Sequence, residues 1–206
     1  MDGLIDMSPD PVLAAEPGRV VGLVGPSGLG LTRLGLGMLA GPARLGPVAA
    51  IDARGWLSPA AAWEVGVGSD RLVVVRCADR SQWPRVAAAL LEGLGAVYAE
   101  FPTGVGDATL RRLAALARSR RSALVLRPLR GGLPSGLAHL RLEAVGVRWE
   151  GAGEGHGRLL RRRITLRAAG RAVAGIEQEV EVDDDGTHAV RVASRLAAAP
   201  AGQAAG

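Results

Sequence analysis

Residues 25–32 could bind phosphate, because they follow the pattern of a phosphate-binding loop, or P-loop. That pattern is G-x-x-x-x-G-K followed by serine or threonine. Gly25, Gly30 and Thr32 fit it, but Leu31 stands where the lysine belongs. The lysine would place its ammonium on the terminal phosphates of a nucleotide, whereas leucine has neither a charge nor a donor. We therefore expect a loop that keeps its shape and loses its strongest nucleotide contact.

Two interpretations of this loop stay open. Backbone N–H groups at the start of a helix attract phosphate even without lysine, so some nucleotide binding could survive. Alternatively, Leu29 and Leu31 pack into the neighbouring structure and the loop is only a structural turn. We favour the second interpretation, which predicts that both leucine side chains are at least partly buried.

The elements around the loop alternate between strand and helix. Apolar runs predict strands at 19–24, 47–52, 71–76, 95–100 and 123–126. Helical spacing predicts helices at 31–40, 59–65, 83–94 and 107–120. This order favours an α/β fold with three αβα layers and a mostly parallel sheet. Beyond residue 132, antiparallel strands at 140–149 and 159–168 and a third run at 174–182 predict a short C-terminal β extension.

The predicted organisation has four parts. Residues 1–17 form a flexible arm, 18–135 the core, 136–195 the β extension with a partner-binding segment, and 196–206 a disordered low-complexity tail.

The order of these elements resembles the RecA-type ATPase core over roughly residues 18–170. That family reads I-D-A-E where this chain has Ile51-Asp52-Ala53-Arg54, and an acid ends its Walker B strand, as Glu100 does here. The resemblance implies that Arg54 replaces the glutamate that activates water and that Glu100 replaces the aspartate of the magnesium shell. Thr32 retains the hydroxyl group that contacts magnesium in that family. We expect no ATP hydrolysis, no catalytic residues, no cofactor and no metal.

The chain differs from RecA itself in two respects, and these differences point to a smaller group of RecA-like proteins. Only six residues, 101–106, follow the Walker B strand where RecA has a long DNA-binding loop, and about 17 residues precede the first strand. In these losses the chain resembles ImuA and ImuA', the RecA-like accessory proteins of the mutasome. The resemblance implies a non-catalytic adaptor in damage-induced translesion synthesis that binds ImuB, an inactive Y-family polymerase relative. RecA is a second candidate partner.

Other functions remain as alternatives to the adaptor. One is a weak or partner-activated ATPase of the RecA type, and another is a regulator of RecA filaments. The formal net charge of +5, carried entirely by arginine, permits contact with nucleic acid or with an acidic partner. The chain has only six aromatic residues, so few side chains could stack on nucleic-acid bases. We therefore expect any DNA contact to be weak or indirect.

We expect partner contacts at an exposed tryptophan and at three charged clusters. Arginines of helix 107–120 form either a phosphate footprint or a solvated face. Arginines of strand 159–168 and the acidic run 177–185 either neutralise each other or dock a partner, and we assign the ImuB contact to this C-terminal third. The candidate residues are Trp56, Arg111, Arg112, Arg118, Arg161, Arg163, Arg167, Glu179 and Glu181. The other tryptophans are expected to anchor packing.

The remaining signals concern compartment and chemistry. The acidic N-terminus lacks the pattern of a signal peptide, and no apolar run reaches about 18 residues, so we expect a cytoplasmic protein without membrane contact. Cys77 is the single cysteine, which excludes an internal disulfide, and we expect a buried, inert thiol. The three histidines lack the spacing of metal ligands.

Overall fold

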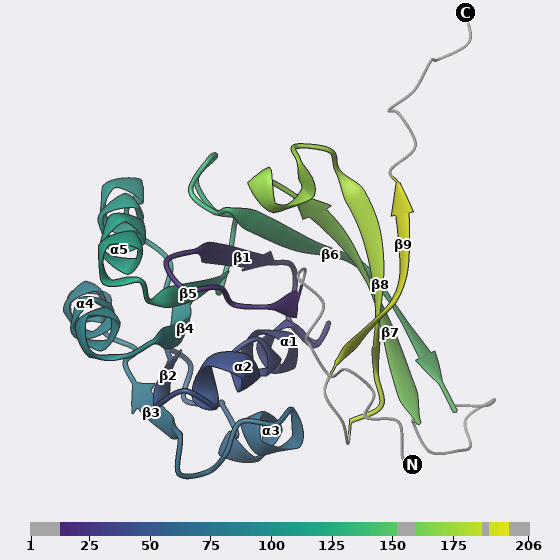
Figure 1. Cartoon of the computed structure of the whole chain (residues 1–206), viewed down its shortest axis with the longest axis horizontal. Coiled ribbons are helices and arrows are strands. Elements are labelled where there is room, and N and C mark those ends of the chain that lie inside the picture. The colour runs from purple at the N-terminus through teal and green to yellow at the C-terminus, as the bar shows by residue number, and fades with distance from the viewer. Residues whose placement is uncertain (1–12, 152–159, 187–189, 198–206) are drawn as a thin grey trace, which may run out of the picture.

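One continuous sheet organises the protein (Figure 1). The computed structural model describes residues 13–151, 160–186 and 190–197. Within those residues, nine strands follow the order β3-β2-β4-β5-β1-β6-β7-β8-β9. The fold is therefore α/β, with a mostly parallel sheet that continues into an antiparallel C-terminal part.

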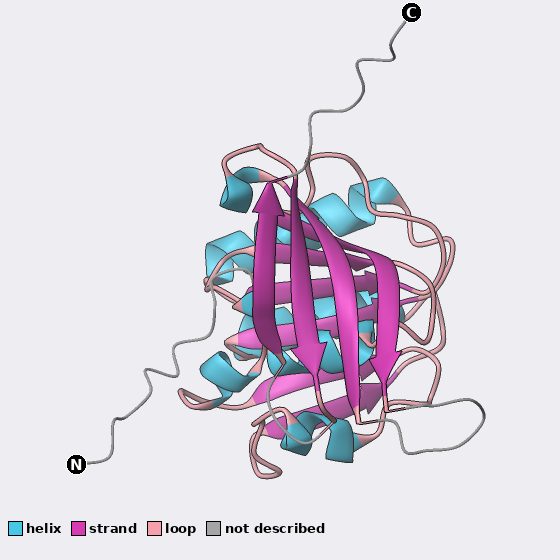
Figure 2. Ribbon diagram, turned by 90° about the vertical axis from the view of Figure 1, so that its right-hand side faces the viewer, coloured by secondary structure: helices cyan, strands magenta, loops and turns pink. Residues whose placement is uncertain are grey.

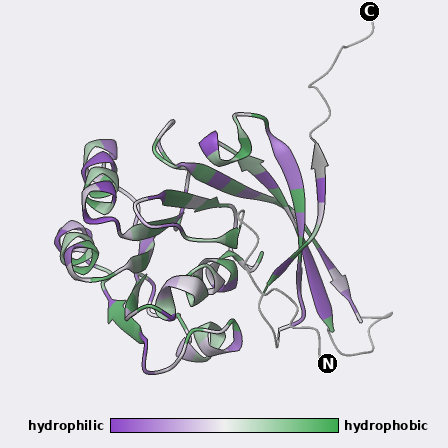
Figure 3. Cartoon of the chain, viewed as in Figure 1, coloured by the Kyte–Doolittle hydropathy of each residue, from purple (hydrophilic) through white to green (hydrophobic). Residues whose placement is uncertain are grey.

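The parallel part holds the strands that the apolar runs predict. They are β1 (Val20–Val24), β2 (Val48–Asp52), β3 (Leu72–Arg76), β4 (Ala96–Phe101) and β5 (Ala123–Pro128). All residues of β1, β2, β4 and β5 are buried, as expected for parallel strands covered on both faces. In Figure 3, β1 is accordingly green along most of its length.

Helices cover both faces of this parallel part. The short helices α1 (Leu31–Gly37), α2 (Ala40–Ala43) and α3 (Pro59–Glu64) pack on one face. The longer helices α4 (Trp83–Gly93) and α5 (Asp107–Arg120) pack on the other. Each face has its own apolar cluster, so the predicted three-layer arrangement is present in this region.

The single helix expected at 31–40 is interrupted after Gly37, and α2 follows it. Gly35 lies in α1 where that helix presses on the sheet, and a Cβ at this position would clash with the ring of Tyr98. The glycine therefore lowers helix propensity but permits the close approach of α1 to β4.

The antiparallel part consists of β6 (Leu140–Glu150), β7 (Arg161–Ala169), β8 (Gln178–Asp184) and β9 (Arg191–Ala197), with a 3₁₀ turn, η2 (Arg171–Val173), after β7. The start of β6 pairs in parallel with β1, from Val21↔Leu140 to Val24↔Glu143. The C-terminal strands therefore extend the same sheet. Figure 2 looks onto their outer face, with the helices behind it.

Several predicted boundaries need correction. Leu13 and Ala15, placed in the flexible arm, are buried in the core, and residues 1–12 lie outside the described residues. The third C-terminal strand lies at 178–184 instead of 174–182. The predicted disordered tail begins at 196, but β9, which was not predicted, extends to Ala197. The remainder, 198–206, is outside the described residues.

Within the described part of the chain, no helix combines the length and the hydropathy needed to cross a membrane.

Candidate functional site at the glycine-rich loop

The glycine-rich loop connects the carboxyl end of β1 with the start of α1. Gly25, Gly28 and Gly30 all have positive φ angles (148°, 89° and 79°). Glycine adopts this backbone conformation more readily than residues with a side chain. Leu31 is 1% exposed, and a Cβ at Gly25 would lie 3.2 Å from its Cδ1. Leu29 is partly buried against the same cluster. The prediction that both leucines pack inward is confirmed, and the side chain at the lysine position points into the core.

Glu100 is the centre of a polar cluster at the carboxyl edge of the sheet. Its side chain is 1% exposed, and Arg54, from the turn after β2, binds both of its oxygens. Arg54 Nε donates to Oε2 at 3.2 Å, and Arg54 Nη2 donates to Oε1. This hydrogen bonding raises the pKa of the Arg54 guanidinium above its usual value.

Two hydroxyl groups complete the shell around Glu100. Thr32 Oγ1 donates to Oε1 of Glu100 at 3.3 Å and lies 3.4 Å from Arg54 Nη2, which donates to it. The Tyr98 hydroxyl also donates to Oε1, at 3.3 Å. Burial raises the pKa of the Tyr98 phenol, and the neighbouring Glu100 carboxylate raises it further. The structure therefore brings together three residues that the sequence predicted for one site: Thr32, Arg54 and Glu100.

Asp52 positions Arg54. Its Oδ1 accepts backbone N–H groups of Arg54 (3.2 Å), Gly55 (2.8 Å) and Trp56 (3.2 Å), and its Oδ2 accepts that of Leu57 (3.0 Å). A carboxylate that accepts several backbone donors folds the following residues into a tight turn. Sequence reasoning gave Asp52 no role, although an aspartate before Ala-Arg-Gly is a recognisable turn signal.

Arg127, at the end of β5, is a second cation beside Glu100. It is 3% exposed, and its Nε lies 3.8 Å from Glu100 Oε1. Neither its Nε nor its Nη1 has a hydrogen-bond partner in the described part of the protein. Sequence reasoning missed this residue, although an arginine that ends a wholly apolar strand is unusual enough to mark it. Glu100 therefore faces two guanidinium groups.

A third guanidinium reaches the loop from the C-terminal sheet. A Cβ at Gly30 would lie 2.5 Å from Cζ of Arg162, so this β7 side chain rests directly on the loop. Arg162 is paired with Asp184 of β8, whose Oδ1 also accepts from Arg33 Nε at 3.0 Å. Arg162 interrupts the apolar face of β7, as the sequence indicated, and this buried network explains why it can do so.

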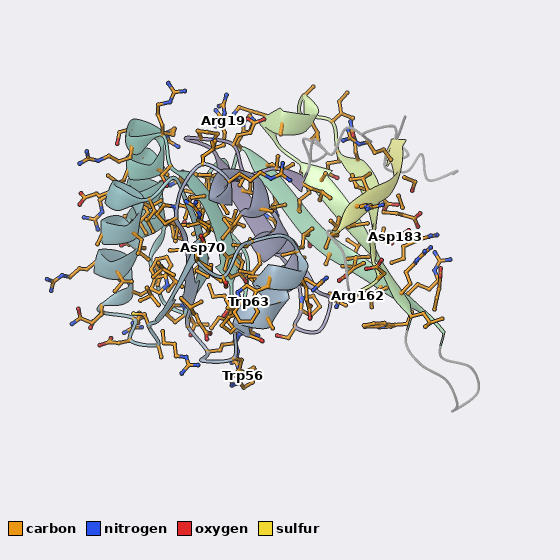
Figure 4. All side chains as sticks on the ribbon, turned by 60° about the horizontal axis from the view of Figure 1, so that its bottom comes forward. Arg19, Trp56, Trp63, Asp70, Arg162 and Asp183 are labelled. Atoms are coloured by element: carbon orange, nitrogen blue, oxygen red, sulfur yellow. The ribbon has the colours of Figure 1, made fainter. Side chains whose placement is uncertain are left out.

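The four tryptophans divide into one core residue and three exposed ones. Trp83 is fully buried, as expected, and its Nε1 donates to the carbonyl oxygen of Glu100 at 2.7 Å. Trp56 is 78% exposed and projects from the surface (Figure 4), with Arg54 Cζ 5.5 Å from its ring centroid. Trp63 and Trp149 are 52% and 45% exposed, so their predicted role as packing anchors is wrong.

Trp56 lies in the turn after β2, and the charged partner-contact candidates lie on two other surfaces. Arg111, Arg112 and Arg118 are exposed on α5, on the face of the sheet away from α1, and Arg111 donates to the carbonyl oxygen of Ser135. The others are on β7 and β8. There the basic and acidic residues pair with each other: Arg163 with Asp183 (2.8 Å), Arg161 with Asp183 (3.8 Å), and Arg148 with Glu181 (3.8 Å). Arg167 stands opposite Glu179 in the strand register.

Two predictions remain, one about the cysteine and one about metal ligands. Cys77 is buried, as expected, and burial raises the pKa of its thiol. Within the described residues, no group of three or more His, Cys, Asp and Glu side chains is placed to hold a metal ion.

The fold and the site define an α/β protein with a glycine-rich loop after its first strand and an arginine-paired acid on a nearby strand. The family model of the MT3502 N-terminal domain matches residues 11–130, more than half of the chain, and the chain belongs to that family. The match covers the loop, Arg54, Glu100 and Arg127, and it stops before β6. A search of curated proteins found no match.

Proposed function

We propose that this protein is a non-catalytic adaptor with a degenerate RecA-like core. It acts in damage-induced translesion DNA synthesis in the cytoplasm, where it binds an ImuB-type polymerase homologue. RecA is a second candidate partner, and DNA contact is weak or indirect. The observation that carries the non-catalytic part is the pairing of Arg54 with Glu100 beside Thr32.

The sheet order supports the RecA-like core. Strand β1, which leads into the glycine-rich loop, is separated from the acid-bearing strand β4 by one strand, β5. Thr32, the Arg54 turn and Glu100 then meet at one edge, as the resemblance to RecA-type ATPases requires of their nucleotide-binding groups.

The arrangement of charge argues against a bound magnesium–nucleotide complex. Magnesium needs oxygen ligands and several waters around it. Here a guanidinium lies against the two oxygen groups, Thr32 Oγ1 and the Glu100 carboxylate, that would hold the metal shell. The position of the lysine is occupied by buried Leu31, and Arg162 rests on Gly30. A nucleotide would have to displace two paired arginine side chains.

The same groups offer no route to hydrolysis. The attacking water needs a residue that orients it or takes its proton. The residue at the corresponding position is Arg54, which stays protonated and has no acceptor. The ATPase alternative requires Arg54 to leave Glu100, so it predicts measurable turnover once a partner is bound.

The C-terminal sheet supports the adaptor assignment, because its outer face carries charged side chains and is not covered by the helices (Figure 2). Truncation after residue 170 would be a poor test of this surface, since it removes the core residues Val180 and Val182. We expect point variants on the outer face to leave the core packing in place.

Co-purification of the full chain with an ImuB-type homologue tests the proposal. We expect a complex that Arg161→Glu and Arg167→Glu weaken, whereas Arg111→Glu and Arg112→Glu on α5 leave it unchanged. An ATPase assay with and without single-stranded DNA and the partner accompanies it. Absence of a complex, or turnover that appears on partner binding, contradicts the adaptor assignment.

A further inference from the structure

Strand β9 ends the sheet on its C-terminal side. Its inner neighbour is β8, and among the described residues no strand pairs with its outer edge. The edge of a sheet presents backbone N–H and C=O groups, and an extended segment of another chain can add to them as a further strand.

The charges of the last three strands alternate from strand to strand. On β7 the charged residues are all basic: Arg161, Arg162, Arg163 and Arg167. On β8 they are all acidic: Glu179, Glu181, Asp183 and Asp184. On β9 they are basic again: Arg191 and Arg195.

Cross-strand contacts follow this alternation. Asp183 of β8 pairs with Arg163 on one side at 2.8 Å and stands opposite Arg191 of β9 on the other. Glu181 accepts from Ser194 Oγ of β9 at 2.9 Å. Opposite charges on neighbouring strands stabilise the pairing, so each strand favours a neighbour of the other sign. Beside the outer edge, Arg191 is exposed on the same face as Asp183, and β9 has no acidic residue.

We propose that the outer edge of β9 docks an acidic extended segment of a partner protein, which continues the sheet and its charge alternation. This inference rests on the adaptor function in giving the docked segment a biological role. The strand pairing itself follows from the edge and its charge.

A second copy of this chain fits the edge poorly. Pairing of β9 with β9 of another copy would join two strands whose charged residues are all arginine. Like charges on opposed strands destabilise such a pair. The occupant that the charges favour is therefore an acidic strand, for which β8 itself is the natural template.

A fluorescent peptide with the β8 sequence, QEVEVDD, is the probe, and its binding to the full chain is measured by fluorescence anisotropy. We expect Arg191→Gln to weaken binding about fivefold and Arg191→Glu to weaken it further, because cross-strand charge pairs contribute up to about 1 kcal/mol each. Arg76→Glu is the matched control, since Arg76 is exposed on β3 at the opposite end of the sheet. It should leave binding unchanged.

Two further probes separate strand addition from general charge attraction. A peptide of the same sequence with methylated backbone nitrogens keeps its charge but loses its donors, so it should not bind. Hydrogen exchange of β9 amides should slow when the unmodified peptide is added. Circular dichroism of each variant checks that removing the charge of Arg191 leaves the fold intact.

Several results would overturn the inference: equal binding by the methylated peptide, equal binding by both Arg191 variants, or dimerisation of the free chain that Arg191→Glu abolishes. The test is also separable from the adaptor function. If the chain binds the peptide but not the ImuB-type homologue, the adaptor assignment fails and the edge site stands. If the complex forms while Arg191→Gln leaves peptide binding unaffected, the edge site is wrong and the adaptor assignment stands.

Discussion

Arg54 binds both carboxylate oxygens of Glu100, although the two residues are 46 positions apart in the chain. Glu100 is almost wholly buried, and Arg54 is 22% exposed at the side chain. Arg54 therefore provides a counterion for a buried acid. In the proposed function, the same residue also stands where a water-activating group would be.

This pairing predicts unequal costs for removing its two members. Glu100→Gln leaves Arg54 and Arg127 without their shared counterion, so we expect a loss of about 3–5 kcal/mol in the free energy of unfolding. Arg54→Gln leaves Glu100 in contact with Arg127 and should cost about 2 kcal/mol, less than the full loss of a buried partner. Urea denaturation measures both.

Arg112→Gln is the control for this comparison, because Arg112 is exposed on α5 and should change stability by less than about 0.5 kcal/mol. Equal stability of Glu100→Gln and the unmodified protein would show that the buried pair does not hold the carboxyl edge together.

Restoring the lysine of the loop should fail. Leu31 is 1% exposed, so Leu31→Lys would bury an ammonium group or force α1 away from β1. We expect a destabilisation of about 3 kcal/mol or more and no gain of ATP binding. Urea denaturation and calorimetric titration with ATP and Mg²⁺ check the two parts. A stable Leu31→Lys protein that binds ATP would mean that the loop keeps a nucleotide-ready conformation.

The network beneath Arg162 should couple the loop region to the C-terminal sheet. Asp184 is 2% exposed at the side chain and holds both Arg162 and Arg33. A double-mutant cycle of Arg162→Met and Asp184→Ala should give a coupling free energy of about 1–3 kcal/mol.

The exposed pair Arg161–Asp183 provides the comparison cycle, with side chains 48% and 27% exposed, and should couple by at most about 1 kcal/mol. If the two cycles give equal values, Arg162 and Asp184 form an ordinary surface pair.

The lowered pKa of His139 predicts how the free energy of unfolding changes with pH. Burial lowers its pKa below the ordinary value of 6.5, and the positive charges of Arg19 and Arg171 lower it further. The folded protein therefore binds fewer protons at this site than the unfolded chain, so this contribution is complete above pH 6.5 and is lost as the pH falls towards the lower folded pKa. His139→Gln should flatten the dependence of unfolding free energy on pH between about 5 and 7. A variant with the same slope as the unmodified protein would contradict this.

Much of the parallel part of the fold could be predicted from the sequence. Continuous apolar runs such as 20–24 and 96–99 are typical of strands buried on both faces, and their alternation with helices fixes a parallel sheet. The C-terminal part was harder. Strand β9 contains two arginines, a serine and two alanines, and its position depends on pairing with β8, which local sequence does not reveal.

The candidate site was predicted only in part, because some of its residues lie in recognisable motifs and others are brought in by the fold. Thr32 and Glu100 were found because the P-loop and Walker B patterns mark them, and Arg54 because it ends the segment that resembles I-D-A-E. The ion pair between Arg54 and Glu100 was not foreseen, since it depends on the turn that Asp52 folds. Arg127 and Arg162 reach the site from β5 and β7, far from any motif in the chain.

In the proposed adaptor, guanidinium groups fill the place of a magnesium–nucleotide complex. Calorimetric titration of the full chain with ATP and Mg²⁺, alone and with single-stranded DNA and an ImuB-type partner, measures this most directly. We expect no saturable binding and no ATP turnover under any of these conditions. Binding with turnover that Thr32→Val or Glu100→Gln abolishes would contradict it and assign the loop to a working ATPase.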